Sequence, residues 1–177
     1  LYTLFQAILD EGDEVIIPAP FWVSYVEMVK LAEGTNVIVP TTFEQNYKLS
    51  AKQLEEAITP KTKAIILCSP SNPTGSVYSK KELEELVSVL KNYPNIIVIA
   101  DEIYEHINYV GKHESIAQFS EIFDRTVIVN GVSKGYAMTG WRIGWIAAPQ
   151  WIASACNKLQ GQYTSGPSSI AQKAAEA

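Results

Sequence analysis

Five side chains offer the groups that chemistry on an aldehyde or an amine requires. They are an amine (Lys134), an acid (Asp101), a phenol (Tyr104), an amide (Asn72) and a guanidinium (Arg142). They lie in three segments that each follow a short apolar run, and Lys134 lies in a Gly-rich turn. Because ligands of folds with parallel strands bind beyond the carboxyl ends of those strands, we expect these groups to meet at one edge of a sheet.

This set of groups suits pyridoxal phosphate, which needs an amine for its aldehyde, an anion for its ring nitrogen and a cation for its phosphate. Lys134 would form a Schiff base with the aldehyde, and an incoming amino acid would free the amine to move a proton. Asp101 would pair with the protonated ring nitrogen, because a carboxylate that ends an apolar strand needs a partner. Taken alone, Lys134 could be an ordinary loop lysine and Asp101 a helix N-cap.

Tyr104 and Asn72 are candidates for the phenolic oxygen of the same cofactor. A helix beginning near Glu102 would point the phenol of Tyr104 to the side of Asp101. The alternatives are core packing for Tyr104, and a simple turn for the Asn-Pro-Thr-Gly segment that starts at Asn72.

The guanidinium of Arg142 could hold the phosphate through a fork of N–H donors, and Ser133 could add a hydroxyl. A surface ion pair and a turn hydroxyl are the alternatives. Trp22, just after a predicted strand, could stack on a flat cofactor or pack in the core, and we expect Tyr25 to pack. The glycine patterns of nucleotide-binding loops are absent.

The composition is that of one globular domain. The 177 residues are 47% hydrophobic and 19% charged, with a net charge of −5 and no long basic run, which argues against a nucleic-acid partner. No stretch predicts a membrane span or a signal peptide. Cys68 and Cys156 are read as reduced thiols of a cytoplasmic protein, and His106 and His113 lack metal-ligand spacing, so no metal site is expected.

Continuous apolar runs alternate with segments of helical period along the whole chain. The predicted strands are residues 14–17, 36–39, 63–68, 95–100, 126–129 and 142–148. Predicted helices include residues 21–31, 50–58 and 149–159, and one that begins at a capping box at Ser79. This alternation predicts an α/β fold of three α/β/α layers with a mostly parallel central sheet.

Four stretches carry a resemblance to a known family: DEGDEVIIPAPFWVSY, SPSNPTGSVYSKKEL, ADEIYEHINY and VNGVSKGYAMTGWRIGW. In this order and with these gaps, the chain resembles the class I/II aminotransferases of the pyridoxal-phosphate fold-type I superfamily, and most closely their bacterial aspartate aminotransferase branch. The resemblance runs along essentially the whole chain.

The resemblance implies a role for each candidate side chain. The cofactor would bind covalently to Lys134, its pyridine nitrogen to Asp101, its phenolic oxygen to Asn72 and Tyr104, its phosphate to Ser133 and Arg142, and its ring face to Trp22. Family members often have a serine three residues before the lysine, where this chain has Gly131.

The resemblance also implies an aminotransferase that moves an amino group between aspartate, or a related amino acid, and a 2-oxo acid such as 2-oxoglutarate. Residues 1–177 would be the central part of the cofactor-binding large domain of a homodimer. Both ends of the chain read as interrupted helices, so the N-terminal arm and the C-terminal small domain are expected to be absent, and this piece alone to be inactive.

Two other functions use the same residues. A lyase or a cyclase on this scaffold would share the steps at Cα, and fold alone does not separate these reactions. A non-catalytic aminotransferase-like sensor domain is the alternative from a different class.

Overall fold

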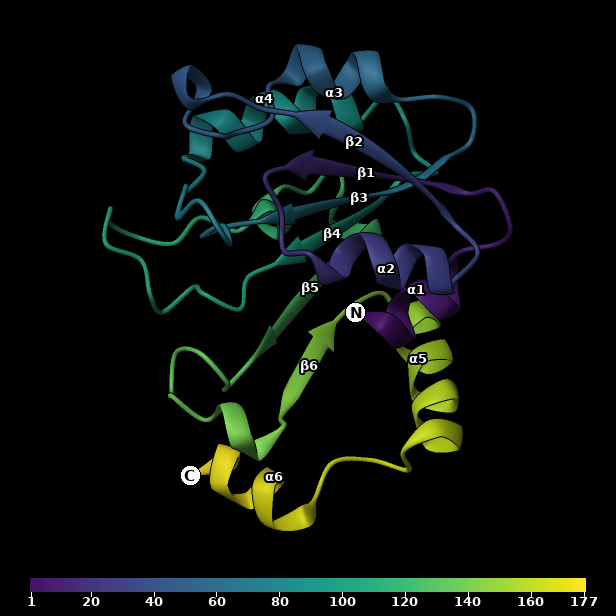
Figure 1. The fold of residues 1–177 in the computed structure, drawn as a ribbon, viewed down its shortest axis with the longest axis vertical. Coiled ribbons are helices and arrows are strands. Elements are labelled where there is room, and N and C mark those ends of the chain that lie inside the picture. Colours follow the sequence, from purple (N-terminus) through teal and green to yellow (C-terminus); the bar gives the residue numbers. More distant parts are fainter.

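The structure, a computed structural model that describes residues 1–177, is built around one six-stranded sheet (Figure 1). The strand order is β2-β1-β3-β4-β5-β6, and only the β5–β6 pair is antiparallel. The strands are β1 (Glu14–Ala19), β2 (Thr35–Pro40), β3 (Thr62–Cys68), β4 (Ile97–Asp101), β5 (Thr126–Gly131) and β6 (Gly144–Ala147). The mostly parallel sheet predicted from the apolar runs is confirmed.

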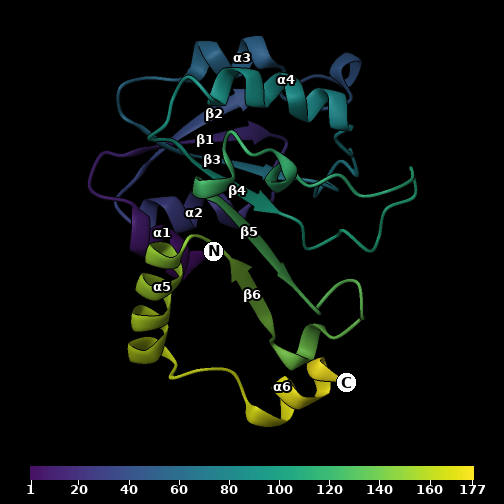
Figure 2. The ribbon, with the colours of Figure 1, turned by 180° about the vertical axis from the view of Figure 1, so that it is seen from behind.

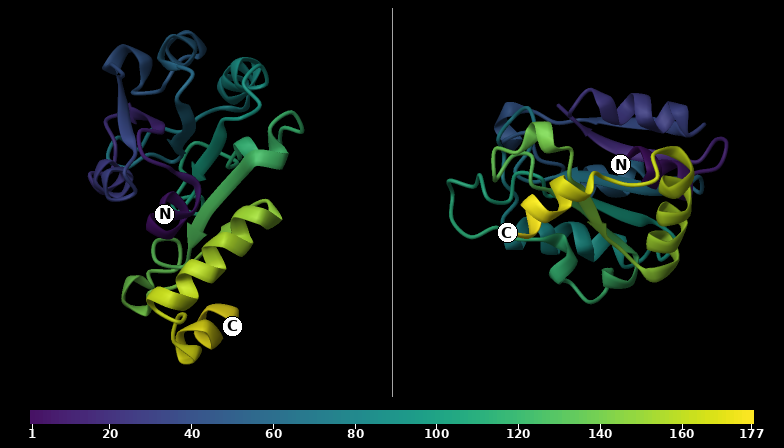
Figure 3. Two further views of the ribbon diagram at one scale, coloured as in Figure 1. Left: turned by 90° about the vertical axis from the view of Figure 1, so that its right-hand side faces the viewer. Right: turned by 90° about the horizontal axis from the view of Figure 1, so that it is seen from below.

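Helices cover both faces of the sheet and complete three layers (Figures 1 and 2). The helices are α1 (Tyr2–Ile8), α2 (Ser24–Leu31), α3 (Ala51–Ala57), α4 (Lys80–Leu90), α5 (Gln150–Tyr163) and α6 (Ser169–Glu176). Helices α3 and α4 pack on one face and α1, α2 and α5 on the other, whereas α6 lies near the short helix η4 (Thr139–Trp141), away from both layers (Figure 3). None of the helices combines the length and the apolar character needed to cross a membrane.

The strands supply two cores because successive side chains point to opposite faces of a sheet. Ile16, Ile65 and Val98 are buried against α3 and α4. Ile17 and Ile66 are buried against α1, α2 and α5. Burying each such side chain stabilises the fold by about 1.5–3 kcal/mol, and burial on both faces explains why the strands are continuous apolar runs.

Helices α3 and α4 begin at capping boxes that the sequence predicts. The hydroxyl of Ser50 accepts a hydrogen bond from the Gln53 N–H (3.2 Å), and that of Ser79 accepts one from the Glu82 N–H (3.3 Å). In each helix the side chain of the later residue bonds back to the serine N–H, at 3.1 and 2.8 Å. Such a cap stabilises a helix start by about 1 kcal/mol, which fixes where each helix leaves its preceding loop.

The helix predicted over residues 21–31 begins later, at Ser24. Before it, the Tyr25 N–H donates to the Trp22 carbonyl oxygen (3.0 Å) in a turn. The indole of Trp22 lines a pocket at the strand ends instead of joining the buried face of the helix. The helical period of the apolar residues extended across this turn and therefore placed the boundary too early.

Two other predictions near the strand ends are also wrong. The segment after β4 is not helical from Glu102 onward, and contains turns in which, for example, the Glu105 N–H donates to the Glu102 carbonyl oxygen (2.9 Å). Strand β6 starts at Gly144, not at Arg142, because Arg142 has a left-handed backbone (φ 56°) that cannot continue a strand.

A largely buried ion pair closes the first half of the long segment between β4 and β5 into a loop. His113 Nε2 lies 3.1 Å from Glu102 Oε2, and only 14% and 7% of the two side chains are exposed. Contact with Glu102 raises the pKa of His113 above its ordinary value of 6.5, as do the charges of Glu105 and Glu114, whereas burial opposes the rise. Glu102, Glu105 and His113 also bring one possible metal-ligand atom each within 4.8 Å of one another, which their sequence spacing does not reveal.

We expect His113→Gln to lower the free energy of unfolding by about 1 kcal/mol at pH values below 6.5, the scale of one ion pair that keeps some contact with solvent. Because folding raises the pKa of His113, the protonated ring stabilises the fold fully below 6.5, and this contribution is lost as the pH rises through the folded-state value. Urea unfolding of both chains at about pH 6 and about pH 9 measures the difference. Equal losses at the two pH values would contradict the ion pair.

Candidate active site

A pocket of about 440 Å³ opens at the carboxyl ends of β1, β3, β4 and β5. This volume lies within the range of about 300–1,000 Å³ that is usual for small-molecule sites. The pocket also lies near the place where the strand order reverses, between β1 and β3. All seven side chains singled out from the sequence line it: Trp22, Asn72, Asp101, Tyr104, Ser133, Lys134 and Arg142.

Asp101, the last residue of β4, is a carboxylate with only 5% of its surface exposed. Its Oδ2 accepts a hydrogen bond from the Tyr25 hydroxyl (2.5 Å), and its Oδ1 accepts one from the Ile103 N–H (3.3 Å). Burial raises the pKa of Asp101, and these two hydrogen bonds oppose the rise. No helix follows Asp101, so the helix-cap alternative is wrong, and a cation placed in the pocket would relieve the buried charge.

The hydrogen bond from Tyr25 to Asp101 was not predicted from the sequence, because Tyr25 was expected only to pack. Burial, together with the charge of Asp101, raises the pKa of the Tyr25 phenol well above its ordinary value, so the phenol stays a hydrogen-bond donor. Its ring also meets the Trp22 ring edge-on, with centroids 5.5 Å apart. No spacing in the sequence indicated the Tyr25–Asp101 contact, because the two residues are 76 positions apart. Cys68 lines the pocket too, and burial raises the pKa of its thiol to about 11, which keeps it unreactive.

Asn72, Tyr104 and Lys134 approach one another from three different loops. Asn72 Nδ2 lies 3.4 Å from the Tyr104 hydroxyl oxygen, and Lys134 Nζ lies 5.9 Å from the centroid of the Tyr104 ring. Burial raises the pKa of the Tyr104 phenol, which favours its protonated form. An amide and a phenol therefore stand ready to donate to one acceptor atom near the lysine amine.

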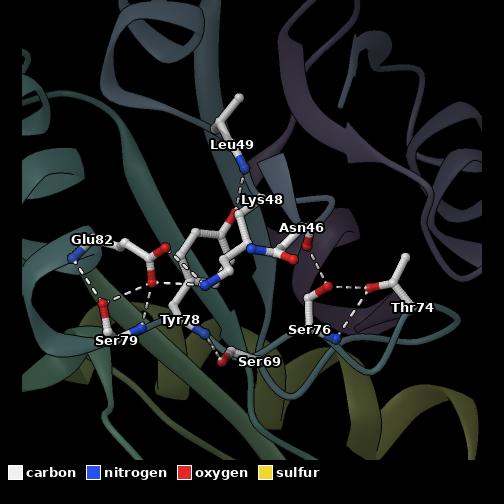
Figure 4. Close-up of polar contacts among 9 residues, drawn as sticks. All are labelled: Asn46, Lys48, Leu49, Ser69, Thr74, Ser76, Tyr78, Ser79 and Glu82. Atoms are coloured by element: carbon white, nitrogen blue, oxygen red, sulfur yellow. Dashed lines mark hydrogen bonds and ion pairs between the residues drawn. The ribbon is translucent and has the colours of Figure 1, made fainter. Parts of the chain in front are cut away.

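Polar contacts anchor the residues on both sides of Asn72 in the sequence, from Ser69 to Tyr78 (Figure 4). The hydroxyl of Ser76 donates to the Asn46 carbonyl oxygen (2.5 Å), and the hydroxyl of Ser69 accepts from the Tyr78 N–H (3.1 Å). The buried Tyr78 hydroxyl accepts from the Leu49 N–H (2.7 Å). These contacts tie the turn to the loop before α3, which fixes the place of Asn72.

The same loop is tied to the start of α4. Lys48 Nζ lies 2.7 Å from Glu82 Oε1, and only 16% of the lysine side chain is exposed (Figure 4). The other carboxylate oxygen of Glu82 accepts from the hydroxyl of Ser79 (2.7 Å), so one side chain serves both the capping box and the ion pair. The loop, the turn and α4 therefore form one connected support for the pocket wall.

Ser133 and Lys134 lie in the turn that follows β5. The Tyr136 N–H donates to the Val132 carbonyl oxygen (3.2 Å), and the Ala137 N–H donates to the Lys134 carbonyl oxygen (3.1 Å). Arg142 Nη1 donates to the Thr139 carbonyl oxygen (2.8 Å), which leaves other N–H donors of the guanidinium for a ligand in the pocket.

Gly131, the last residue of β5, allows β5 and β6 to approach closely. A Cβ atom at this position would lie 2.7 Å from the Ile143 carbonyl oxygen and 2.9 Å from Gly144 Cα. Both are backbone atoms, so a side chain at this position would require the backbone of β5 and that of residues 143–144 to move apart.

Comparison with known proteins agrees with this geometry. The family described as Aminotransferase class I and II matches residues 1–177. The chain is 55% identical over 178 residues to the aspartate aminotransferase of Bacillus sp. (strain YM-2), covering 99% of this chain and 45% of that protein. It is 54% identical over 179 residues to the bifunctional aspartate aminotransferase and glutamate/aspartate-prephenate aminotransferase of Petunia hybrida, covering 99% and 37%.

Among solved structures, that of the aspartate aminotransferase from Rhizobium meliloti matches with a TM-score of 0.95 and 44% identity, covering 98% of this chain and 44% of that one. The chain therefore belongs to the class I and II aminotransferase family, which confirms the resemblance carried by its four motifs. It spans less than half the length of these relatives.

We expect Gly131→Ser to lower the free energy of unfolding by about 1–3 kcal/mol, the usual cost of overpacking, because the backbone of β6 must move away. Gly140→Ser is the matched control, since a Cβ at Gly140 would meet no atom within 4 Å. Urea unfolding of the two variants compares them, and similar midpoints would contradict the close strand contact.

We expect Asp101→Asn to stabilise the ligand-free chain near neutral pH by on the order of 1 kcal/mol, because it removes a poorly compensated buried charge. Since burial raises the pKa of Asp101, its charged form destabilises the fold increasingly as the pH rises from 3.8 through the folded-state value. The increase in the free energy of unfolding caused by Asp101→Asn, measured by urea unfolding, is therefore expected to be smaller at about pH 4 than near neutral pH.

Asp124→Asn serves as the control for this prediction, because 85% of the Asp124 side chain is exposed. A loss of stability in Asp101→Asn at both pH values would show that the buried charge is fully compensated. An equal gain in the control would show that burial of the charge is not the cause.

Proposed function

We propose that this chain is the central part of the large domain of a pyridoxal-phosphate-dependent aminotransferase. The observation that carries the proposal is the meeting of Lys134, Asp101 and Arg142 in one pocket at the strand ends. An amine, a buried anion and a guanidinium are the three groups that the cofactor's aldehyde, ring nitrogen and phosphate each require.

The pocket fits this cofactor in size and in chemistry. Its volume of about 440 Å³ suits a small phosphorylated ring. The exposed part of Trp22 offers a flat apolar wall, and Ser133 adds a hydroxyl beside Arg142. The buried carboxylate of Asp101, whose pKa is raised by burial, favours a cationic partner.

When bound, pyridoxal phosphate supplies an aldehyde that takes up the amino group and a ring that accepts electrons from Cα. Lys134 would hold the cofactor through its amine and, once released by a substrate amine, would carry the proton between Cα and the cofactor. Asp101 would keep the ring nitrogen protonated, with Tyr25 fixing the carboxylate in place. Asn72 and Tyr104 would donate to the phenolic oxygen.

The remaining side chains would position the cofactor. Arg142 and Ser133 would bind its phosphate, and Trp22 would stack on its ring. Gly131 has no hydroxyl that could bind the phosphate, whereas family members often have a serine at this position. Arg142 and Ser133 would therefore bind the phosphate without that additional hydroxyl.

The names of the relatives support aspartate, or a related amino acid, as the amino donor. We propose a 2-oxo acid such as 2-oxoglutarate as the acceptor. They also favour amino transfer over the lyase, cyclase and sensor alternatives, which share the same pocket residues. The proposal includes assembly of the protein into a homodimer. The cytoplasmic location inferred from the two thiols stays a prediction.

To test the proposal, the 177-residue chain is mixed with pyridoxal phosphate and reduced with borohydride, and the modified peptides are mapped by mass spectrometry. We expect labelling of Lys134 to exceed that of any other lysine by roughly tenfold, because the pocket holds the aldehyde beside this amine. Excess inorganic phosphate should reduce the labelling of Lys134 selectively.

Lys134→Ala is expected to lose the preferred label, whereas Lys173→Ala, which changes a lysine with 80% of its side chain exposed, should keep it. Labelling spread evenly over the lysines, with no effect of phosphate, would refute a formed cofactor site in this chain.

A further inference from the structure

Two irregular segments bring Tyr104 and Lys134 to the pocket, and after the Glu102 N–H, which donates to the Val129 carbonyl oxygen of β5 (2.9 Å), neither continues a strand or a helix. Residues 102–107 follow β4 and residues 132–137 follow β5, and both are turns. Backbone hydrogen bonds fix the shape of each turn, but none of them joins residues 103–107 to residues 132–137, so the relative placement of the phenol and the amine needs side-chain contacts.

The first such contact is a hydrogen bond from Asn130 Nδ2 to Glu105 Oε1 (2.7 Å). Asn130 is 7% exposed and belongs to β5, whereas Glu105 directly follows Tyr104. Asn130 Oδ1 accepts from the Gly131 N–H (2.7 Å), and this fixes the orientation of the amide, because only its oxygen can accept. The amide nitrogen must therefore face the carboxylate of Glu105.

The second contact joins His106 to Gly135 and Tyr136. The ring of His106 covers Gly135, where an added Cβ would lie 2.9 Å from His106 Cδ2. The same ring meets the Tyr136 ring edge-on at 5.3 Å, and its Nε2 lies 3.3 Å from Glu105 Oε1. Glu105 thus stands between Asn130 on one side and His106 on the other.

We propose that Asn130, Glu105 and His106 form a brace that locks the Tyr104 turn against the Lys134 turn. The three are positioning residues, since none of them lines the pocket. The brace would keep Lys134 Nζ near its observed 5.9 Å from the Tyr104 ring. This inference rests on the proposed function for its purpose, but the mechanical link between the turns is testable without the cofactor.

The sharpest variant is Asn130→Asp, because it keeps the shape of the side chain and an oxygen for the Gly131 N–H. It replaces the amide donor that faces Glu105 with a second carboxylate. The two carboxylates repel each other, and the hydrogen bond between positions 130 and 105 is lost. Adding Glu105→Gln to this variant restores a donor–acceptor pair with the roles exchanged. A double-mutant cycle over these two positions therefore isolates their contact.

Amide hydrogen exchange of the ligand-free chain gives the first readout. We expect Asn130→Asp to speed exchange roughly tenfold in peptides from both 102–107 and 132–137, with no change in α4. The double variant should return both segments toward the parent rates. Faster exchange in only one segment, or no rescue in the double variant, would overturn the brace.

Glu105→Ala covers the case in which Asn130→Asp does not fold, because 30% of the Glu105 side chain is exposed and its loss leaves the core intact. It too should speed exchange in both segments together. Unchanged exchange in both would refute the proposal.

Borohydride labelling in the presence of pyridoxal phosphate gives the second readout. If the parent chain labels Lys134 selectively, Asn130→Asp should lower that selectivity several-fold and the double variant should recover it. Selective labelling that stays equal in all variants would overturn the brace alone. Absence of selective labelling in the parent would overturn the proposed function and leave the exchange result to decide the mechanical link.

Discussion

The site depends on one unfavourable placement, a carboxylate at the end of a strand that is buried on both faces. Burial removes most of the water that would solvate the carboxylate of Asp101. The hydrogen bonds from the Tyr25 hydroxyl and the Ile103 N–H compensate only part of this loss. The parallel arrangement makes this placement possible, because it brings the carboxyl ends of β1, β3, β4 and β5 to one edge. A cationic ligand would complete the compensation, so the same burial that disfavours the empty pocket favours its occupation.

The fold could be predicted from the sequence largely because its signals are local. Strands such as β4 are runs of hydrocarbon side chains, and the boxes at Ser50 and Ser79 mark where α3 and α4 begin. The pocket residues could be proposed because each follows such a run, and strand ends must converge in a parallel sheet. What lies within a few residues of a strand end was therefore accessible to sequence reasoning.

The rest depended on packing between distant segments. The Tyr25–Asp101 and Asn130–Glu105 hydrogen bonds join residues 76 and 25 positions apart, and neither pair has a recognisable spacing. The left-handed backbone at Arg142, which delays the start of β6, lies at the end of the short helix η4, and an apolar run alone could not reveal it. These contacts orient groups whose chemical types were already evident, so the sequence indicated which groups take part but not how they are held.

The register of the sheet has a consequence for how relatives of this chain can differ in length. Cys68 lies beside Asp101 across β3 and β4, and Ala100 lies beside Ile128 across β4 and β5. Inserting or deleting one residue within β4 would turn the carboxylate to the opposite face and bring a core side chain to the pocket. The loop at residues 109–112 is exposed and pairs with no strand, so it can absorb such changes. Insertions and deletions among relatives are therefore compatible with the site in such loops and incompatible with it inside the central strands.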